Sequence, residues 1–231
     1  MRIDHDPQPQ NGCVRATLED ADKLHVLHPG QIIAYKGKPS GREDRFMDIA
    51  GMYRKRKWIR SRIAGPAELL LGMPPGCRLH TLQLEAQSDL LFDLRNVLFF
   101  TDGMTMKNRL QSFKNAVITK ELVRMRFAGP GQLGIVTTGE MTALELDPSI
   151  PLFVDATALI AYPENAAIKL SVYGNSLASQ HMRVQWELIG SGPVLVQTGS
   201  ADAQLESQVR QDGLLRRTLR EVLPFGGVFI K

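Results

Sequence analysis

Apolar and polar residues alternate along most of this chain with a period of two, the pattern that indicates half-buried β-strands. Three alternating stretches, residues 59–63, 123–127 and 184–188, each lead into a glycine-containing segment and then into an apolar run. These segments recur about every 60 residues, which predicts three copies of one β unit. Structural turns are expected at the following positions: Gly65, Pro66, Gly129, Pro130, Gly190 and Gly192.

The strands that follow the glycines also resemble one another. Residues 81–85 and 143–147 alternate in the same way, and each is followed by an apolar strand that ends in an aspartate, Asp93 or Asp155. Because aspartate favours turns, we predict that these two residues cap turns and do not form a catalytic pair. A weaker copy of the pattern occupies residues 24–35, so the β units extend over about residues 14–198.

Two segments depart from the β pattern. Residues 42–57 carry Phe46, Ile49 and Tyr53 at helical spacing, which predicts a short helix before a strand at Trp58. Residues 214–223 place leucines on one stripe and arginines on the other, which predicts an amphipathic C-terminal helix that an edge strand could follow.

Composition favours one all-β domain, a double-stranded β-helix or barrel-like sandwich built from internal repeats and ending in a short helix. With 231 residues, 43% of them hydrophobic, the chain can bury a sizeable core. We expect a polar N-terminal tail at residues 1–12, a β-repeat domain at 13–200 with a basic insert at 42–62, and the C-terminal helix and possible edge strand within 201–231.

The apolar runs are too short for a transmembrane helix, and the first residues lack the core of a secretory signal. Two cysteines provide no disulfide framework, so a reducing cytoplasm is predicted.

Several segments together resemble a known family. The quoted stretches are LHPGQIIAYKG, RIAGPAELLLG, LLFDLRNVLFF, RFAGPGQLGIV and ELIGSGPVLVQTG. In this order they resemble bacterial members of the altered-inheritance-of-mitochondria protein family, twenty-four type. The resemblance implies a fold like that of the tryptophan-RNA-binding attenuator protein, frequent oligomerisation and no established enzymatic activity. The insert that is commonly glycine-rich in such proteins is basic here.

The basic insert is the main candidate for binding an anionic ligand. Cations that contact phosphate beside aromatic rings that stack on bases are typical of single-stranded nucleic acid binding. The same cations could instead contact an anionic membrane surface, or could form a solvated edge that discourages strand pairing. The candidate residues are Tyr53, Arg54, Lys55, Arg56, Lys57, Trp58, Arg60 and Arg62.

The other chemistry in the sequence is weak. His25, His28 and His80 are the candidates for a cupin-like metal enzyme, but their spacing is poor, so no metal and no cofactor are expected. The sequence therefore predicts a non-enzymatic binding or scaffold protein that assembles with itself and could have a protein partner. The alternatives are nucleic acid binding, peripheral membrane association and, last, a metal enzyme.

Overall fold

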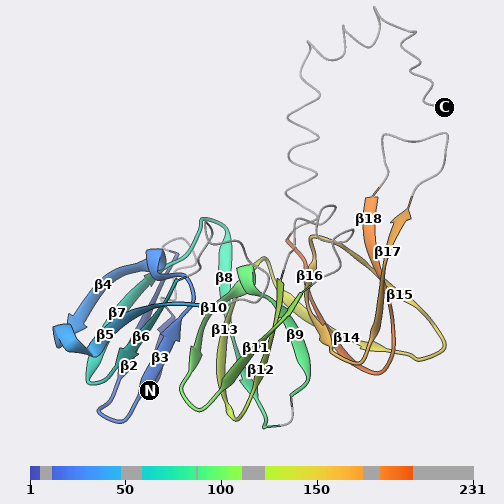
Figure 1. The fold of residues 1–231 in the computed structure, drawn as a ribbon. Helices are drawn as coiled ribbons and strands as arrows, with labels where there is room; N and C mark the ends of the chain where they lie inside the picture. Colours follow the sequence, from blue (N-terminus) through green and yellow to red (C-terminus); the bar gives the residue numbers. More distant parts are fainter. Residues whose placement is uncertain (6–11, 48–58, 87, 111–122, 174–182, 200–231) are drawn as a thin grey trace, which may run out of the picture.

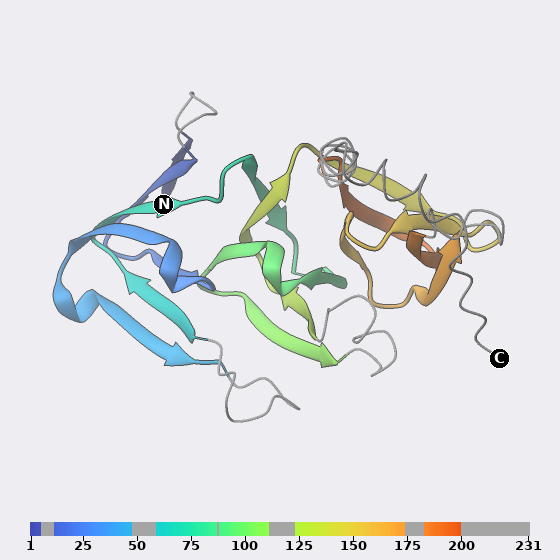
Figure 2. The ribbon, with the colours of Figure 1, turned by 90° about the horizontal axis from the view of Figure 1, so that it is seen from above.

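The structure, a computed structural model, describes residues 1–5, 12–47, 59–86, 88–110, 123–173 and 183–199. These residues form strands and three short 3₁₀ helices, with no α-helix among them, which confirms the predicted all-β fold. The strands lie in a row of three groups, seen side by side in Figure 1 and from above in Figure 2. No described helix has the length and apolar character needed to cross a membrane.

After the N-terminal strand β1 (Arg2–His5), the chain forms three groups of six strands, which we call unit 1, unit 2 and unit 3. Unit 1 contains β2 (Cys13–Leu18), β3 (Lys23–Val26), β4 (Ile32–Gly37), β5 (Arg42–Phe46), β6 (Ile59–Ala64) and β7 (Ala67–Gly72). Unit 2 contains β8 (Cys77–Leu84), β9 (Leu90–Asp93), β10 (Val97–Thr101), β11 (Thr105–Leu110), β12 (Val123–Ala128) and β13 (Gly131–Thr138). Unit 3 contains β14 (Met141–Leu146), β15 (Leu152–Asp155), β16 (Leu159–Pro163), β17 (Ala167–Tyr173), β18 (Arg183–Ile189) and β19 (Gly192–Gln197). The 3₁₀ helices are η1 (Pro29–Gln31), η2 (Pro39–Gly41) and η3 (Leu94–Asn96).

The three units pair their strands in the same way. Within each unit the sixth strand pairs with the first and the third, while the fifth pairs with the second and the fourth. The two halves of a unit therefore lie in two different sheets. Sheet A has the order β1-β2-β7-β4, sheet B β5-β6-β3-β10-β13-β8, sheet C β11-β12-β9-β16-β19-β14 and sheet D β15-β18-β17.

Sheets B and C each join two units. The β3–β10 pairing joins units 1 and 2, and we call it the first junction. The β9–β16 pairing joins units 2 and 3 and is the second junction. All described pairs are antiparallel, and no described sheet closes into a barrel.

Three apolar cores fill the spaces between the four sheets. Leu24, Ile63 and Leu69 belong to the core between sheets A and B. Phe100 and Phe127 meet between sheets B and C, with ring centroids 5.4 Å apart. Trp186, which is fully buried, anchors the core between sheets C and D. These cores explain why apolar and polar residues alternate in the sequence, because every second side chain of a strand faces a core.

The glycine segments are corners where the chain passes from one sheet to the next. Gly65 and Pro66 connect β6 of sheet B to β7 of sheet A, and the other two segments connect the corresponding strands of units 2 and 3. A Cβ at Gly65 would lie 1.8 Å from the Glu19 carbonyl oxygen, so only glycine fits there. Gly129 has φ 110°, a backbone conformation that glycine adopts most readily.

Two segments differ from the sequence prediction. Residues 42–46 of the predicted helix form the strand β5, and Phe46, expected on the apolar side of that helix, is 64% exposed. Pairing with β6 overrides the thin helical pattern, because Asp44 accepts a hydrogen bond from Ser61 across the sheet. The expected polar tail contains β1, which pairs with β2. The predicted C-terminal helix lies outside the described residues.

Candidate functional site

Two of the predicted anion-binding residues, Arg60 and Arg62, lie in β6; the other six lie outside the described residues. Their neighbours Ser61 and Ile63 are fully buried towards sheet A. Because side chains alternate along a strand, Arg60 and Arg62 project from the opposite side of sheet B. Both arginines are half-buried there.

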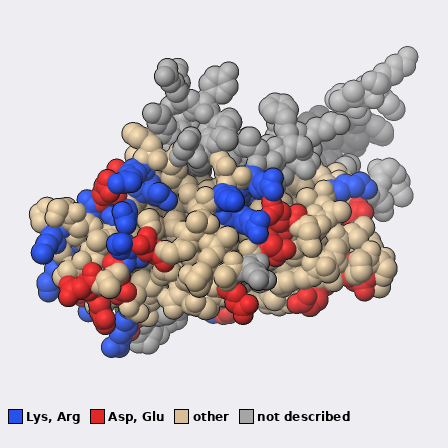
Figure 3. Space-filling view, turned by 60° about the horizontal axis from the view of Figure 1, so that its bottom comes forward, with Lys and Arg blue, Asp and Glu red and all other residues tan. Residues whose placement is uncertain are grey.

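Further charged residues lie on the same side of the sheet. Across the strands, Arg45 is directly opposite Arg60, Glu43 is opposite Arg62, and Lys23 is opposite Ala64. We call the side formed by Lys23, Glu43, Arg45, Arg60, Arg62 and Asp102 the basic face. On the side of the molecule drawn in Figure 3, Lys and Arg gather in separate groups with Asp and Glu beside them, so the positive charge is local.

The carboxylates of the basic face are committed to other partners. Glu43 Oε1 lies 2.7 Å from Arg45 of its own strand. Asp102 lies 3.3 Å from Lys23 Nζ and 3.1 Å from His25 Nε2. Among the described residues, neither Arg60 nor Arg62 has a hydrogen-bond or ion-pair partner. Like charges opposite one another destabilise a sheet, so Arg45 and Arg60 represent a cost within the fold.

Unit 2 places arginines at the equivalent positions but neutralises them. Arg124 and Arg126 of β12 stand before Gly129 as Arg60 and Arg62 stand before Gly65. Glu164 accepts hydrogen bonds from both Arg126 and Arg109, each at 2.6 Å. Arg124 is opposite Asp93 in the sheet, and it is 1% exposed.

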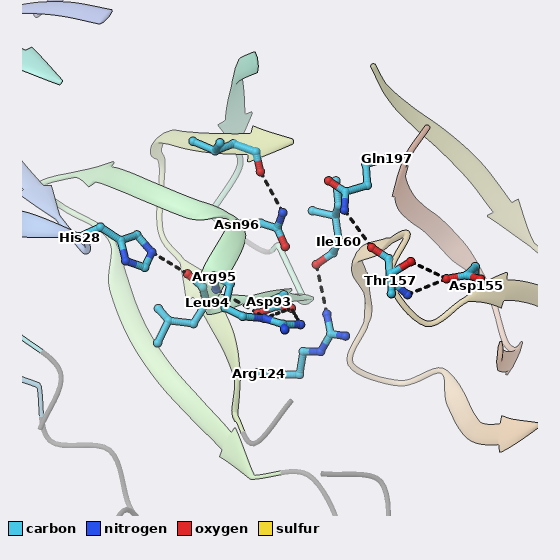
Figure 4. Close-up of polar contacts among 11 residues, drawn as sticks. His28, Asp93, Leu94, Arg95, Asn96, Arg124, Asp155, Thr157, Ile160 and Gln197 are labelled. Atoms are coloured by element: carbon cyan, nitrogen blue, oxygen red, sulfur yellow. Dashed lines mark hydrogen bonds and ion pairs between the residues drawn. The ribbon is translucent and has the colours of Figure 1, made fainter. Parts of the chain in front are cut away.

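Buried Arg124 is held by several groups. Its Nη1 donates to the Ile160 carbonyl oxygen at 3.3 Å, as Figure 4 shows, and its guanidinium lies 5.5 Å from the centre of the Tyr162 ring. Burial acts to raise the pKa of Asp93, but the hydrogen bond from Arg95 and the charges of Arg124 and Arg95 outweigh it and hold that pKa below 3.8. Asp93 therefore remains ionised beside Arg124.

In unit 3 the same positions carry balanced charges. Gln185 and Glu187 replace the two arginines, and Lys169 lies opposite Glu187 with its Nζ 3.3 Å from the carboxylate. The charge at these two positions therefore differs among the units. It is balanced in unit 3 and neutralised by neighbouring residues in unit 2. In unit 1 neither arginine has a described hydrogen-bond or ion-pair partner.

Asp102 and Glu164 occupy equivalent places at the two junctions. The Asp102 backbone N–H donates to the Lys23 carbonyl oxygen at 3.0 Å, and that of Glu164 donates to the Asp89 carbonyl oxygen at 2.9 Å. Their side chains have different partners. The shorter Asp102 contacts Lys23 and His25 on β3, whereas Glu164 reaches Arg109 on β11 and Arg126 on β12.

His25 forms the floor of the basic face. The residue is 7% exposed, and its ring stacks on Phe100 with centroids 4.6 Å apart. Burial lowers its pKa from 6.5, the hydrogen bond to Asp102 acts in the opposite direction, and the charges of Arg60 and Arg62 add to the lowering. Its Nδ1 is buried without a hydrogen-bond partner among the described residues.

The three candidate metal-binding histidines do not come together. His28 lies beyond the end of β3 and donates from Nε2 to the Leu94 carbonyl oxygen at 3.2 Å (Figure 4), and burial lowers its pKa. His80 lies in β8, which β10 and β13 separate from β3. In the part of the chain that the structure describes, no three His, Cys, Asp or Glu residues are grouped as a metal site.

The prediction that Asp93 and Asp155 cap turns is confirmed. The Asp93 carboxylate accepts a hydrogen bond from the Arg95 backbone N–H at 2.9 Å, and that of Asp155 accepts one from the Thr157 backbone N–H at 2.8 Å (Figure 4).

Arg124 and Arg126 were not singled out in the sequence analysis. The signal was present, because RSRIAG and RMRFAG place two alternate arginines at the same distance before a glycine.

Comparison with known proteins now identifies the family. Residues 8–199 match the family described as "Mitochondrial biogenesis AIM24". The chain belongs to this family. A crystal structure of a Streptococcus pyogenes protein shares the fold, with a TM-score of 0.66 and 15% sequence identity, covering 91% of this chain and 99% of that one. No individual curated protein matches the sequence. The family match extends over all three units, so the basic face lies within the matched residues.

Proposed function

We propose that this protein is a non-enzymatic binding protein whose basic face takes up single-stranded nucleic acid. The supporting observation is the contrast between equivalent arginines. Arg126 donates a hydrogen bond to Glu164, and Arg124 is buried opposite Asp93. Glu43 lies opposite Arg62, but no hydrogen bond or ion pair joins Arg60 or Arg62 to a described residue. In unit 2 the Glu164 carboxylate accepts hydrogen bonds from Arg126 and Arg109, which correspond to Arg62 and Arg45 of unit 1, and this supports an anionic oxygen group as the partner of the unit 1 arginines. An external phosphate at Arg62 would have the same role, and Arg60 would supply a second cation beside it.

A polymer fits this face better than a single ion. Arg60 and Arg62 are two residues apart on a strand, so their backbones are separated by about 7 Å and present cations in a regular row. By sequence, four further cations and two aromatic residues lie at 53–58 in the same insert. Cations for phosphates and rings for bases are the two components of sequence-independent single-strand binding.

The test measures binding of a fluorescent oligothymidylate by anisotropy over a range of salt concentrations. Each phosphate contact with a single strand contributes a slope of about 0.7 to the salt dependence of the logarithm of the affinity. R60Q/R62Q should therefore weaken binding at low salt and reduce that slope by about 1.4. R2Q/R15Q is the matched control, because it removes the same charge from sheet A, where Arg2 pairs with Asp4 and Arg15 with Glu68.

Three results would contradict this proposal. Equal weakening by both double variants would mean that only net charge matters. An absence of binding at low salt would remove the nucleic acid proposal. Binding to anionic but not neutral vesicles, lost in R60Q/R62Q and without oligonucleotide binding, would assign the basic face to a membrane surface instead.

We also propose self-assembly, because a specific apolar surface favours it. The described part of sheet D ends at β15 and β17, and Phe153 and Val172 on these strands are 49% and 52% exposed. Unpaired strands with exposed apolar side chains favour association with another chain. Light scattering should give a mass above that of one 25.7 kDa chain, and F153E should lower it. A wild-type monomer at micromolar concentration would exclude this part of the proposal.

A further inference from the structure

His25 lies between charges of opposite sign on the basic face. Asp102 is 3.1 Å from its Nε2, and Arg62 is directly opposite on β6. A carboxylate can only accept a hydrogen bond, so Nε2 carries the hydrogen in the neutral ring. A second proton would be held at Nδ1, which is buried and has no partner among the described residues.

The groups around His25 act on its charge in opposite directions. The carboxylate of Asp102 favours the imidazolium, whereas burial and the charges of Arg60 and Arg62 oppose it. The remaining charged groups on this side of the packed strands are Lys23 on its own strand, and Glu43 and Arg45 on β5; Arg42 and Asp44 of β5 lie on the other side, opposite Ile63 and Ser61. The hydrogen bond from His25 and the contact with Lys23 lower the pKa of Asp102, so its carboxylate remains ionised. His25 is therefore the titratable group on this face whose charge depends on both the carboxylate and the arginines.

An anion bound to Arg60 and Arg62 would change this balance, because it neutralises the two charges that oppose the imidazolium. We propose that anion binding at the basic face is coupled to protonation of His25, so that the protein binds its ligand more tightly as the pH falls. This inference rests on the proposed function, since the ligand and the site are the same. It assigns His25 as a positioning and regulatory residue that lies beneath the arginines.

The direction of the effect follows from linkage. In the free protein, burial and the arginines hold the pKa of His25 below 6.5. The bound anion raises that pKa, so the complex takes up a proton at any pH between the free and bound values. Affinity is constant above this window, rises as the pH falls through it, and becomes constant again below it.

Unit 2 has no histidine at the position equivalent to His25. At the position equivalent to His25, the second junction carries Leu91, which lies opposite Arg126. Leucine cannot take up a proton, and Glu164 supplies a permanent negative charge there instead. Of the two junctions, the histidine is therefore found at the one whose arginines have no described partner.

The test is isothermal titration calorimetry of wild-type protein with oligothymidylate near pH 6, in two non-phosphate buffers that differ in ionisation enthalpy. This probe is suitable because neither its phosphodiesters nor thymine titrates between about pH 5 and 8. We expect uptake of up to one proton per complex and a several-fold rise in affinity on going from pH 7.5 to about pH 5.5. H25Q keeps a donor for Asp102 but cannot take up the proton, so its binding should be independent of pH and its proton uptake should vanish.

H28Q is the matched control, because His28 is also a histidine of lowered pKa but contacts Leu94 away from the basic face. Its proton uptake should equal that of the wild type. The His25 ring can also be titrated by NMR in the wild-type protein with and without oligonucleotide, which keeps the test valid if H25Q does not fold. A His25 pKa that does not rise on binding, or proton uptake that persists in H25Q, would overturn the coupling alone. An absence of oligonucleotide binding would overturn the proposed function and the coupling with it.

Discussion

The first and second junctions have the same strand pairing but different chemistry. At both junctions a carboxylate follows the third strand of one unit. Two arginines lie on the fifth strand of the preceding unit, with that unit's second strand in between. At the second junction Glu164 binds one arginine and Asp93 lies beside the other. At the first junction Asp102 contacts His25 and Lys23, so Arg60 and Arg62 are left without a described partner. One backbone arrangement thus supports a structural charge network in one place and an accessible cationic surface in the other.

Burial explains why the two junctions can differ. Arg124 is 1% exposed, and a buried charge without compensation would cost several kcal/mol, so unit 2 needs its carboxylates. Arg60 and Arg62 are only half-buried, and water lowers the cost of leaving them unpaired. Unpaired charge is therefore located where the fold can tolerate it.

The largest expected effect comes from removing the buried counter-charge of the second junction. D93A leaves Arg124 buried opposite an alanine, and it should lower the free energy of unfolding by about 3 to 5 kcal/mol. Urea denaturation followed by circular dichroism measures this change. D155A is the matched control, because Asp155 caps the corresponding turn but has Gln185 opposite it, and it should cost about 1 kcal/mol. Equal losses in the two variants would show that Asp93 acts only as a turn cap.

A smaller effect is expected from converting the second junction into a copy of the first. E164Q removes the charge shared by Arg109 and Arg126, which are partly exposed, so the stability cost should be about 1 kcal/mol. The freed arginines should increase the salt slope of oligothymidylate binding by up to about 1.4. E187Q in unit 3 frees one lysine and should change the slope by less. An unchanged slope in E164Q would mean that arginines at this position do not bind phosphate.

The smallest effect should come from the reverse change at the first junction. D102E adds one methylene, so the carboxylate could reach Arg62 as Glu164 reaches Arg126. We expect a several-fold loss of oligothymidylate affinity in the anisotropy assay, with little change in thermal stability. D4E on β1 lengthens an exposed carboxylate away from this face and provides the control. Affinity equal to that of the wild type would contradict the equivalence of Asp102 and Glu164.

The sequence predicted the strands well and the site only in part. Alternation around Ile63, Phe127 and Leu188 reports burial directly, so the all-β fold could be inferred from a single chain. Charge spacing along the sequence identified Arg60 and Arg62 as candidates. It could not show that Asp102 would turn away from them while Glu164 reaches its arginines, because both outcomes depend on strands far apart in sequence. The helix prediction was wrong for residues 42–46, because cross-strand pairing decides the conformation of such a short charged segment.

The division of each unit between two sheets has a consequence for how the chain can be cut. A break between β7 and β8 falls between units, yet it leaves half of sheet B on each fragment. Each fragment would expose a strand of the first junction and the apolar residues behind it, so neither would be self-sufficient. The two pieces should instead recombine when mixed, which makes this connection a natural place to build a split protein whose halves report on each other's presence.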